Sequence, residues 1–123
     1  MKRNKPSTDG GGNLIFASGM KPVKTKADIV QRLAPYREQI RQLGVVSLSL
    51  FGSFVRDEAD AGSDVDLLVQ FAPDSKTFDR FMALVFLLED ALGRTVELVT
   101  PESLSPYIGN QILSEAENVP FAA

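Results

Sequence analysis

The stretches LFGS (residues 50–53) and DVD (residues 64–66), separated by ten residues, decide the fold of this chain. The apolar, β-branched residues before the glycine predict a buried strand at 45–51, and the apolar residues around DVD predict a second strand at 64–71. Successive side chains of a strand point to opposite faces, so the two aspartates are predicted to project from the same face. The sequence therefore predicts a strand that ends at a glycine turn, followed by a second strand with two aspartates on one face.

Paired acids of this kind favour metal binding. Two nearby carboxylates repel each other, and each raises the pKa of the other unless a cation lies between them. Mg²⁺ or Mn²⁺ is the hard ion that carboxylates and phosphate oxygens bind, so Asp64 and Asp66 predict a metal site. Gly52 lets a ligand approach the backbone, and a helix starting at Ser53 would offer its free amides to an anion. Together these residues predict a cradle for a metal-bound triphosphate.

Each part of this pattern also has a simpler interpretation. A Gly-Ser pair alone is usually a turn, and a lone Asp-x-Asp pair usually lies on a solvated strand face. The apolar residues 67–69 argue against a solvated face, because they predict a buried strand in which two unpaired acids would be costly. The spacing and its context therefore favour the metal–triphosphate interpretation.

Composition excludes several other kinds of chemistry. The chain has 123 residues, 44% of them hydrophobic, which fits one globular domain. It has no cysteine and no histidine, which excludes thiolate metal sites, Cys-His catalysis and Ser-His-Asp catalysis. It has no apolar run of about 18 residues, so no transmembrane helix is expected. The sequence also lacks a secretory signal pattern, which favours a cytoplasmic protein.

Charge is distributed unevenly along the chain. Residues 1–26 contain six Lys or Arg and one Asp, whereas residues 27–123 contain seven basic and fifteen acidic residues. An acidic body is a poor electrostatic match for a nucleic-acid backbone, so nucleic acid is not the expected partner.

The remaining elements alternate between helices and strands. Residues 1–19 show no periodicity and predict a flexible leader, which leaves 20–123 as the folded domain. An apolar stripe predicts a helix from Thr25 to Gly44 that Pro35 interrupts. We also expect a short helix at 54–59, a long helix at 75–92, a strand at 95–99 and a last helix at 101–117. This order predicts an α/β domain with a small central sheet flanked by helices in two or three layers.

Four large apolar residues of the predicted long helix have two interpretations. Phe78, Phe81, Met82 and Phe86 could pack in the core or stack on a nucleotide base. Their helical spacing favours the core.

The two stretches, extended to Leu50–Arg56 and Ser63–Val69, resemble the signature of the minimal nucleotidyltransferases. These proteins are the smallest branch of the DNA polymerase β-like superfamily, and many are antitoxins paired with HEPN-domain toxins. The resemblance runs from about Lys24 to Phe121 and includes residues 96–107. It implies a small mixed sheet of the polymerase β-like palm fold. It also implies Mg²⁺-dependent transfer of a nucleoside monophosphate, most simply AMP from ATP, to a hydroxyl of a partner protein.

The resemblance assigns roles to individual residues. Gly52 and Ser53 would hold the β- and γ-phosphates, and Asp64 and Asp66 would be metal ligands and catalytic residues. The third carboxylate of the family maps onto Glu97, which would be a metal ligand and would activate the acceptor hydroxyl. Two further residues, Arg56 and Ser63, are predicted nucleotide-binding residues. From the residues alone, Arg56 can equally pair with neighbouring acids and Ser63 can simply shape the turn.

Two departures from the family pattern keep other functions open. The family usually has Asp where this chain has Glu97, and the extra methylene moves the carboxylate by about 1.5 Å. The family usually has Gly where this chain has Asp57. One alternative is therefore a weakly catalytic or non-catalytic antitoxin that neutralises a HEPN toxin by binding. Another alternative is a nucleotide sensor. Either a homo-oligomer or a hetero-oligomer fits the resemblance.

Overall fold

A mixed four-stranded sheet in the order β3-β2-β1-β4 forms the centre of the molecule. The computed structural model describes residues 21–120, so the predicted leader at 1–19 lies outside the described residues. The strands are β1 (Val45–Phe51), β2 (Val65–Phe71), β3 (Val96–Val99) and β4 (Glu117–Asn118). Strand β1 runs antiparallel to both β2 and β4, and β2 runs parallel to β3.

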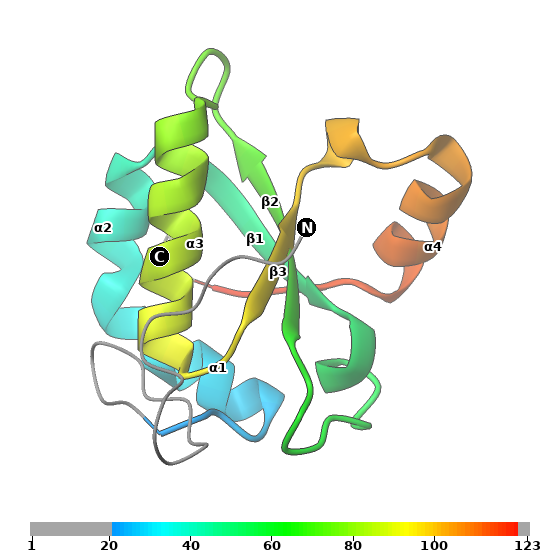
Figure 1. Cartoon of the computed structure of the whole chain (residues 1–123). Helices are drawn as coiled ribbons and strands as arrows, with labels where there is room; N and C mark the ends of the chain where they lie inside the picture. The colour runs from blue at the N-terminus through cyan, green and yellow to red at the C-terminus, as the bar shows by residue number, and fades with distance from the viewer. Residues whose placement is uncertain (1–20, 121–123) are drawn as a thin grey trace, which may run out of the picture.

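Four α-helices accompany the sheet within the described range: α1 (Lys26–Leu33), α2 (Arg37–Gln42), α3 (Phe78–Leu92) and α4 (Pro106–Glu115). In Figure 1, α2 and α3 stand beside each other on one side of the sheet, whereas α4 lies on the other side of β3. No helix of this part of the chain is long and apolar enough to cross a membrane.

Local sequence signals explain where the long helices begin and end. The side chain of Thr25 accepts a hydrogen bond from the backbone of Asp28 and so caps the start of α1. Thr77 caps the start of α3 in the same way, by accepting from the backbone of Arg80. Helix α3 ends at Gly93, whose φ of 67° is the left-handed conformation that glycine adopts at low cost. Pro35 lies in a 3-10 turn, Ala34–Tyr36, which separates α1 from α2 as predicted.

The sheet has one buried face and one more open face. Fully or nearly fully buried apolar side chains on its strands pack with α1, α2 and α3; among them are Leu48, Leu50, Val65, Leu67, Val69, Val96, Leu98, Ile29, Leu33, Ile40, Leu84, Leu88 and Leu92. The strand residues between them point to the opposite face, which is where Asp66 and Glu97 lie. The burial pattern therefore leaves the predicted site on the open face.

Several predicted elements differ from the structure. The predicted short helix at 54–59 is wrong, because a single 3-10 turn, η2 (Gly52–Phe54), follows β1 directly. The predicted last helix is divided into a 3-10 turn, η3 (Pro101–Ser103), and α4, since Ser105 and Pro106 begin a new capped helix. Strand β4 was not predicted from the sequence.

The aromatic residues of α3 are less buried than predicted. Phe78 is 78% exposed and Phe86 is 55% exposed, so the core assignment is wrong for both. Phe81 packs against the core and, together with Phe78, lines a hollow of about 410 Å³ beside Val99.

Candidate active site

The turn after β1 requires a glycine for two independent reasons. Gly52 has a φ of 80°, in the region where a side chain is strained. A Cβ added to it would lie 2.2 Å from Oδ2 of Asp66, much closer than a real Cβ contact. The backbone of the turn therefore lies directly against the carboxylate of Asp66.

The register of the sheet places the acids together. Asp66 is paired with Phe51 on the β1 side and with Glu97 on the β3 side. Asp64 immediately precedes β2 and is exposed, whereas Asp66 is half-buried. The structure thus brings Gly52, Asp64, Asp66 and Glu97 to one end of the open face.

The surroundings of Asp66 disfavour its charged form, as its pKa shows. Burial, and then the nearby negative charges of Glu97, Asp64 and, to a smaller extent, Glu115, raise the pKa of Asp66 to about 6. Arg56 opposes this effect by favouring the charged carboxylate. A cation among these acids would relieve the repulsion, so the donor set fits a hard divalent ion.

The acids do not form a complete metal site by themselves. Within residues 21–120, no group of three such side chains is arranged to hold a metal ion. Mg²⁺ commonly takes only one or two carboxylates from a protein and fills its shell with water and substrate phosphates. A pair of aspartates fits that mode of binding better than a closed cage.

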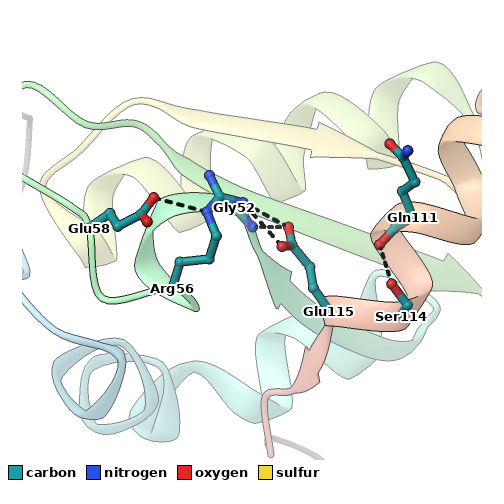
Figure 2. A network of polar contacts seen from close by, with 6 residues as sticks. All are labelled: Gly52, Arg56, Glu58, Gln111, Ser114 and Glu115. Atoms are coloured by element: carbon teal, nitrogen blue, oxygen red, sulfur yellow. Dashed lines mark hydrogen bonds and ion pairs between the residues drawn. The ribbon is translucent and has the colours of Figure 1, made fainter.

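Arg56 lies between two glutamates, as Figure 2 shows. Its Nε donates to Glu58 at 3.0 Å, and its Nη1 donates to Glu115 at 3.1 Å. The same carboxylate of Glu115 accepts a hydrogen bond from the backbone N–H of Gly52 at 2.8 Å. Of the neighbouring acids Asp57, Glu58 and Asp60, only Glu58 is a partner in these contacts. Glu115, 59 residues away, was not foreseen.

Two other predicted residues lie in the connections around the site. The hydroxyl of Ser63 accepts from the backbone of Asp60 at 2.9 Å and donates to the side chain of Asp60 at 3.2 Å. These contacts shape the turn before Asp64. Asp57 has a φ of 60°, so the position at which the family pattern implied glycine adopts the left-handed conformation. Aspartate is among the residues that tolerate this conformation best.

A buried arginine, also missed by the sequence reasoning, holds the segment before Asp64. Arg94 is only 7% exposed, and its Nη1 donates to the backbone carbonyls of Asp60, Ala61 and Ser63 at 2.8–3.3 Å. Its guanidinium carbon lies 5.1 Å from the ring centre of Phe54, in the turn that contains Gly52. Arg94 therefore contacts both sequence stretches of the site.

The chain is similar to known proteins over a range that includes these site residues. Residues 32–119 match the family model described as nucleotidyltransferase domain. Protein adenylyltransferase MntA of Thermococcus cleftensis is 37% identical over 92 residues, which cover 74% of this chain and 92% of the relative. A solved minimal nucleotidyltransferase is 35% identical with a TM-score of 0.60, covering 72% of this chain and 93% of that one.

A more distant solved structure resembles the chain in fold. It contains tri-AMPylated Shewanella oneidensis HEPN toxin in complex with MNT antitoxin. The match has 22% identity and a TM-score of 0.53, and covers 75% of this chain and 72% of that one. Together with the observed mixed sheet, these likenesses confirm the predicted fold class.

Proposed function

The chain belongs to the nucleotidyltransferase domain family, and from this premise we propose that it transfers AMP from ATP to a hydroxyl of a partner protein. The observation that carries the proposal is the position of Asp66. It lies against the backbone of Gly52 on one side and opposite Glu97 on the other. A phosphate-binding turn and catalytic acids must be adjacent in this way if they act on the same triphosphate.

Asp64 and Asp66 would hold the metal ion, with Glu97 as the third carboxylate. Mg²⁺ or Mn²⁺ suits their oxygen ligands and the phosphates of ATP. When bound, the ion would neutralise charge on the phosphates and on the departing pyrophosphate. The raised pKa of Asp66 supports a cation at this position, because repulsion among the acids is the second cause of that shift after burial.

The other residues would orient the triphosphate and move one proton. Gly52 and Ser53 would hold the β- and γ-phosphates, while Arg56 would contribute positive charge nearby. Glu97 would accept the proton of the acceptor hydroxyl, whose oxygen then bonds to the α-phosphorus. The bond between the α-phosphorus and the bridging oxygen breaks, and pyrophosphate leaves. Ser63 would act on the nucleotide through the turn that precedes Asp64.

The proposed acceptor is a HEPN-domain toxin. The name of the Thermococcus relative, protein adenylyltransferase, and the AMPylated toxin in the Shewanella complex support this assignment. The reaction would take place in the cytoplasm, where ATP and Mg²⁺ are plentiful.

A binding-only antitoxin is the second candidate function. It is favoured by glutamate, instead of aspartate, at 97, because the longer side chain displaces the third carboxylate. Such a protein would neutralise its toxin without modifying it.

One experiment separates the two candidates. The purified chain is incubated with ATP, Mg²⁺ and the toxin encoded beside its gene, and the toxin is analysed by mass spectrometry. We expect adenylylated toxin with the wild type and none with Asp64→Asn plus Asp66→Asn. Neutralised but unmodified toxin with both proteins would support the binding-only function instead. Equal ATP affinity with and without a divalent ion would also contradict the proposed site.

A further inference from the structure

The carboxylate of Glu115 joins helix α4 to the proposed phosphate site, although 63 residues separate it from Gly52. We propose that Glu115 is a positioning residue, which fixes the Gly52 turn and the Arg56 guanidinium for the incoming triphosphate. The inference rests on the proposed function, since it concerns the same site. It adds a residue to which neither the sequence nor the likenesses reported above gave a role.

The first step of the argument is the register of β4. Strand β4 pairs with β1 only at Ser49 and Leu50, opposite Asn118 and Glu117. Continuing this antiparallel register by two residues places Glu115 opposite Gly52. Helix α4 ends at Glu115, so a side-chain carboxylate accepts the N–H of Gly52 where a longer strand would have offered a backbone carbonyl.

The second step concerns the conformation of the turn. Gly52 has a φ of 80°, one of several conformations that glycine adopts at similar cost, so the contacts of the turn decide which conformation it keeps. A hydrogen bond to an ionised acceptor is stronger than one between neutral groups. The bond from Gly52 to Glu115 therefore fixes the peptide between Phe51 and Gly52, and with it the direction of the following amides.

The third step is the orientation of Arg56. The guanidinium is held by Glu58 through Nε and by Glu115 through Nη1, and neither bond uses Nη2 (Figure 2). One side chain thus contacts both the turn and the cation that would face the phosphates. Removing the Glu115 carboxylate would release the Gly52 turn and the Arg56 guanidinium together.

The position of Glu115 argues against the opposite role, an internal anion that blocks the phosphate site. Asp66 is paired on the β2 edge of β1, whereas Glu115 approaches Gly52 from the β4 edge. The two carboxylates therefore contact the turn from different edges of the strand. The negative charge of Glu115 contributes to the raised pKa of Asp66, but it is the smallest of the causes given by neighbouring acids. The proposed metal and its phosphates would lie with Asp66, and Glu115 would hold the turn from the β4 edge.

The chain offers a matched control in Glu58. It pairs with the same Arg56 but has no bond to Gly52 in the contacts described above. We compare the wild type, Glu115→Gln, Glu115→Ala and Glu58→Gln by calorimetry with Mg²⁺ and a non-hydrolysable ATP analogue. The ¹H–¹⁵N amide signals of Gly52 and Ser53 are recorded without nucleotide.

We expect Glu115→Ala to bind the analogue about tenfold more weakly and Glu115→Gln to be intermediate, because it keeps an acceptor oxygen. Glu58→Gln should lose less affinity than Glu115→Ala, because Glu58 holds Arg56 but not the Gly52 turn. The Gly52 amide signal should move in Glu115→Ala and stay in place in Glu58→Gln. Equal or tighter binding by Glu115→Ala, or an unchanged Gly52 signal, overturns the proposal. If Glu115→Ala does not fold, Glu115→Gln carries the comparison. If the wild type binds no analogue, the proposed function fails, and the amide signals alone decide the role of Glu115.

Discussion

Asp66 lies directly opposite Glu97 in the parallel pairing of β2 with β3. Parallel partners point their side chains to the same face, so this pairing fixes two of the three acids without help from a loop. Asp64 lies one residue before β2 and depends on the turn at 60–63, which Arg94 holds. The positions of Asp66 and Glu97 should therefore be less sensitive to substitutions in the loops than the position of Asp64.

Metal affinity should depend on pH near the pKa of Asp66. Burial and the neighbouring acids raise this pKa to about 6, so below that value the carboxylate carries a proton and cannot bind a cation well. We expect Mg²⁺-dependent binding of an ATP analogue to weaken by about tenfold from pH 7.5 to pH 5. Calorimetry across this range checks it. Constant affinity between pH 5 and pH 7.5 would show that protonation of Asp66 does not control metal binding in this range.

Removing the charge of Asp66 should stabilise the metal-free protein. Because the folded pKa is above the value of 3.8 for a free carboxyl, protonation of Asp66 stabilises the fold below about pH 4. That contribution is lost as the pH rises through about 6. Asp66→Asn should therefore gain about 1 kcal/mol at pH 7.5, a modest figure because Asp66 is half exposed to solvent. The gain corresponds to about 4 °C in Tm.

The pH dependence of this gain tests its cause. Thermal melts of Asp66→Asn and the wild type should converge near pH 4. Glu102→Gln, which alters an exposed acid away from the site, should give a small difference that does not grow with pH. A constant offset between Asp66→Asn and the wild type at all pH values would mean that charge is not the reason.

Gly52→Ala should damage the turn and Gly109→Ala should not. At Gly52 the new methyl would meet Asp66 in a left-handed conformation, so a loss of about 1–3 kcal/mol is expected. At Gly109, inside α4, the nearest atom to a new Cβ is that of Leu104 at an ordinary 3.6 Å. Alanine favours a helix more than glycine does, so this control should be neutral or slightly stabilising. Equal Tm values for the two variants would contradict the geometry of the turn.

Part of this structure could be predicted from local sequence, and the rest depends on contacts between distant segments. Helix caps such as Thr25 and Gly93, the buried strands and the adjacency of Gly52 to Asp66 follow from residue type and spacing. Strand β4 is only two residues long, too short to give an alternating pattern.

Glu115 and Arg94 could not be found in that way. Their partners lie 59 or more residues away for Glu115, and 31 or more for the hydrogen bonds of Arg94. Each looks like an ordinary surface charge in the sequence. Phe78 and Phe86 were predicted to lie in the core but are exposed. Helical spacing alone does not reveal which positions of a helix another element covers.

Arg94→Lys should weaken the site as well as the fold. A lysine ammonium has no planar fork to reach the carbonyls of Asp60, Ala61 and Ser63 together, and it cannot stack on Phe54 in the same way. We expect a loss of about 2 kcal/mol in stability and at least a few-fold loss in affinity for the Mg²⁺–ATP analogue complex. Thermal melts and calorimetry on the same samples measure both.

Arg32 supplies the control for this prediction. Its Nη1 donates to the backbone carbonyl of Ala91 at 2.9 Å, between α1 and α3 and away from the acids. Arg32→Lys should lower Tm without changing analogue affinity. If Arg94→Lys likewise changed only Tm, Arg94 would be a structural residue and nothing more.

Glu97 decides between the enzyme and the binding-only antitoxin. If Glu97 accepts the proton of the acceptor hydroxyl, Glu97→Gln should lower kcat by about 10²–10⁴-fold while nucleotide affinity changes little, because the residue acts in the transition state. Glu97→Asp should maintain or raise the rate, since the shorter side chain matches the residue usual at this position. The rate of toxin adenylylation by the wild type, Glu97→Gln and Glu97→Asp is measured in single-turnover reactions analysed by mass spectrometry. Equal toxin neutralisation by the three with no adenylylation in any of them would establish binding as the function. A rate that Glu97→Gln leaves intact would assign proton transfer to another group, because an amide cannot accept the proton at neutral pH.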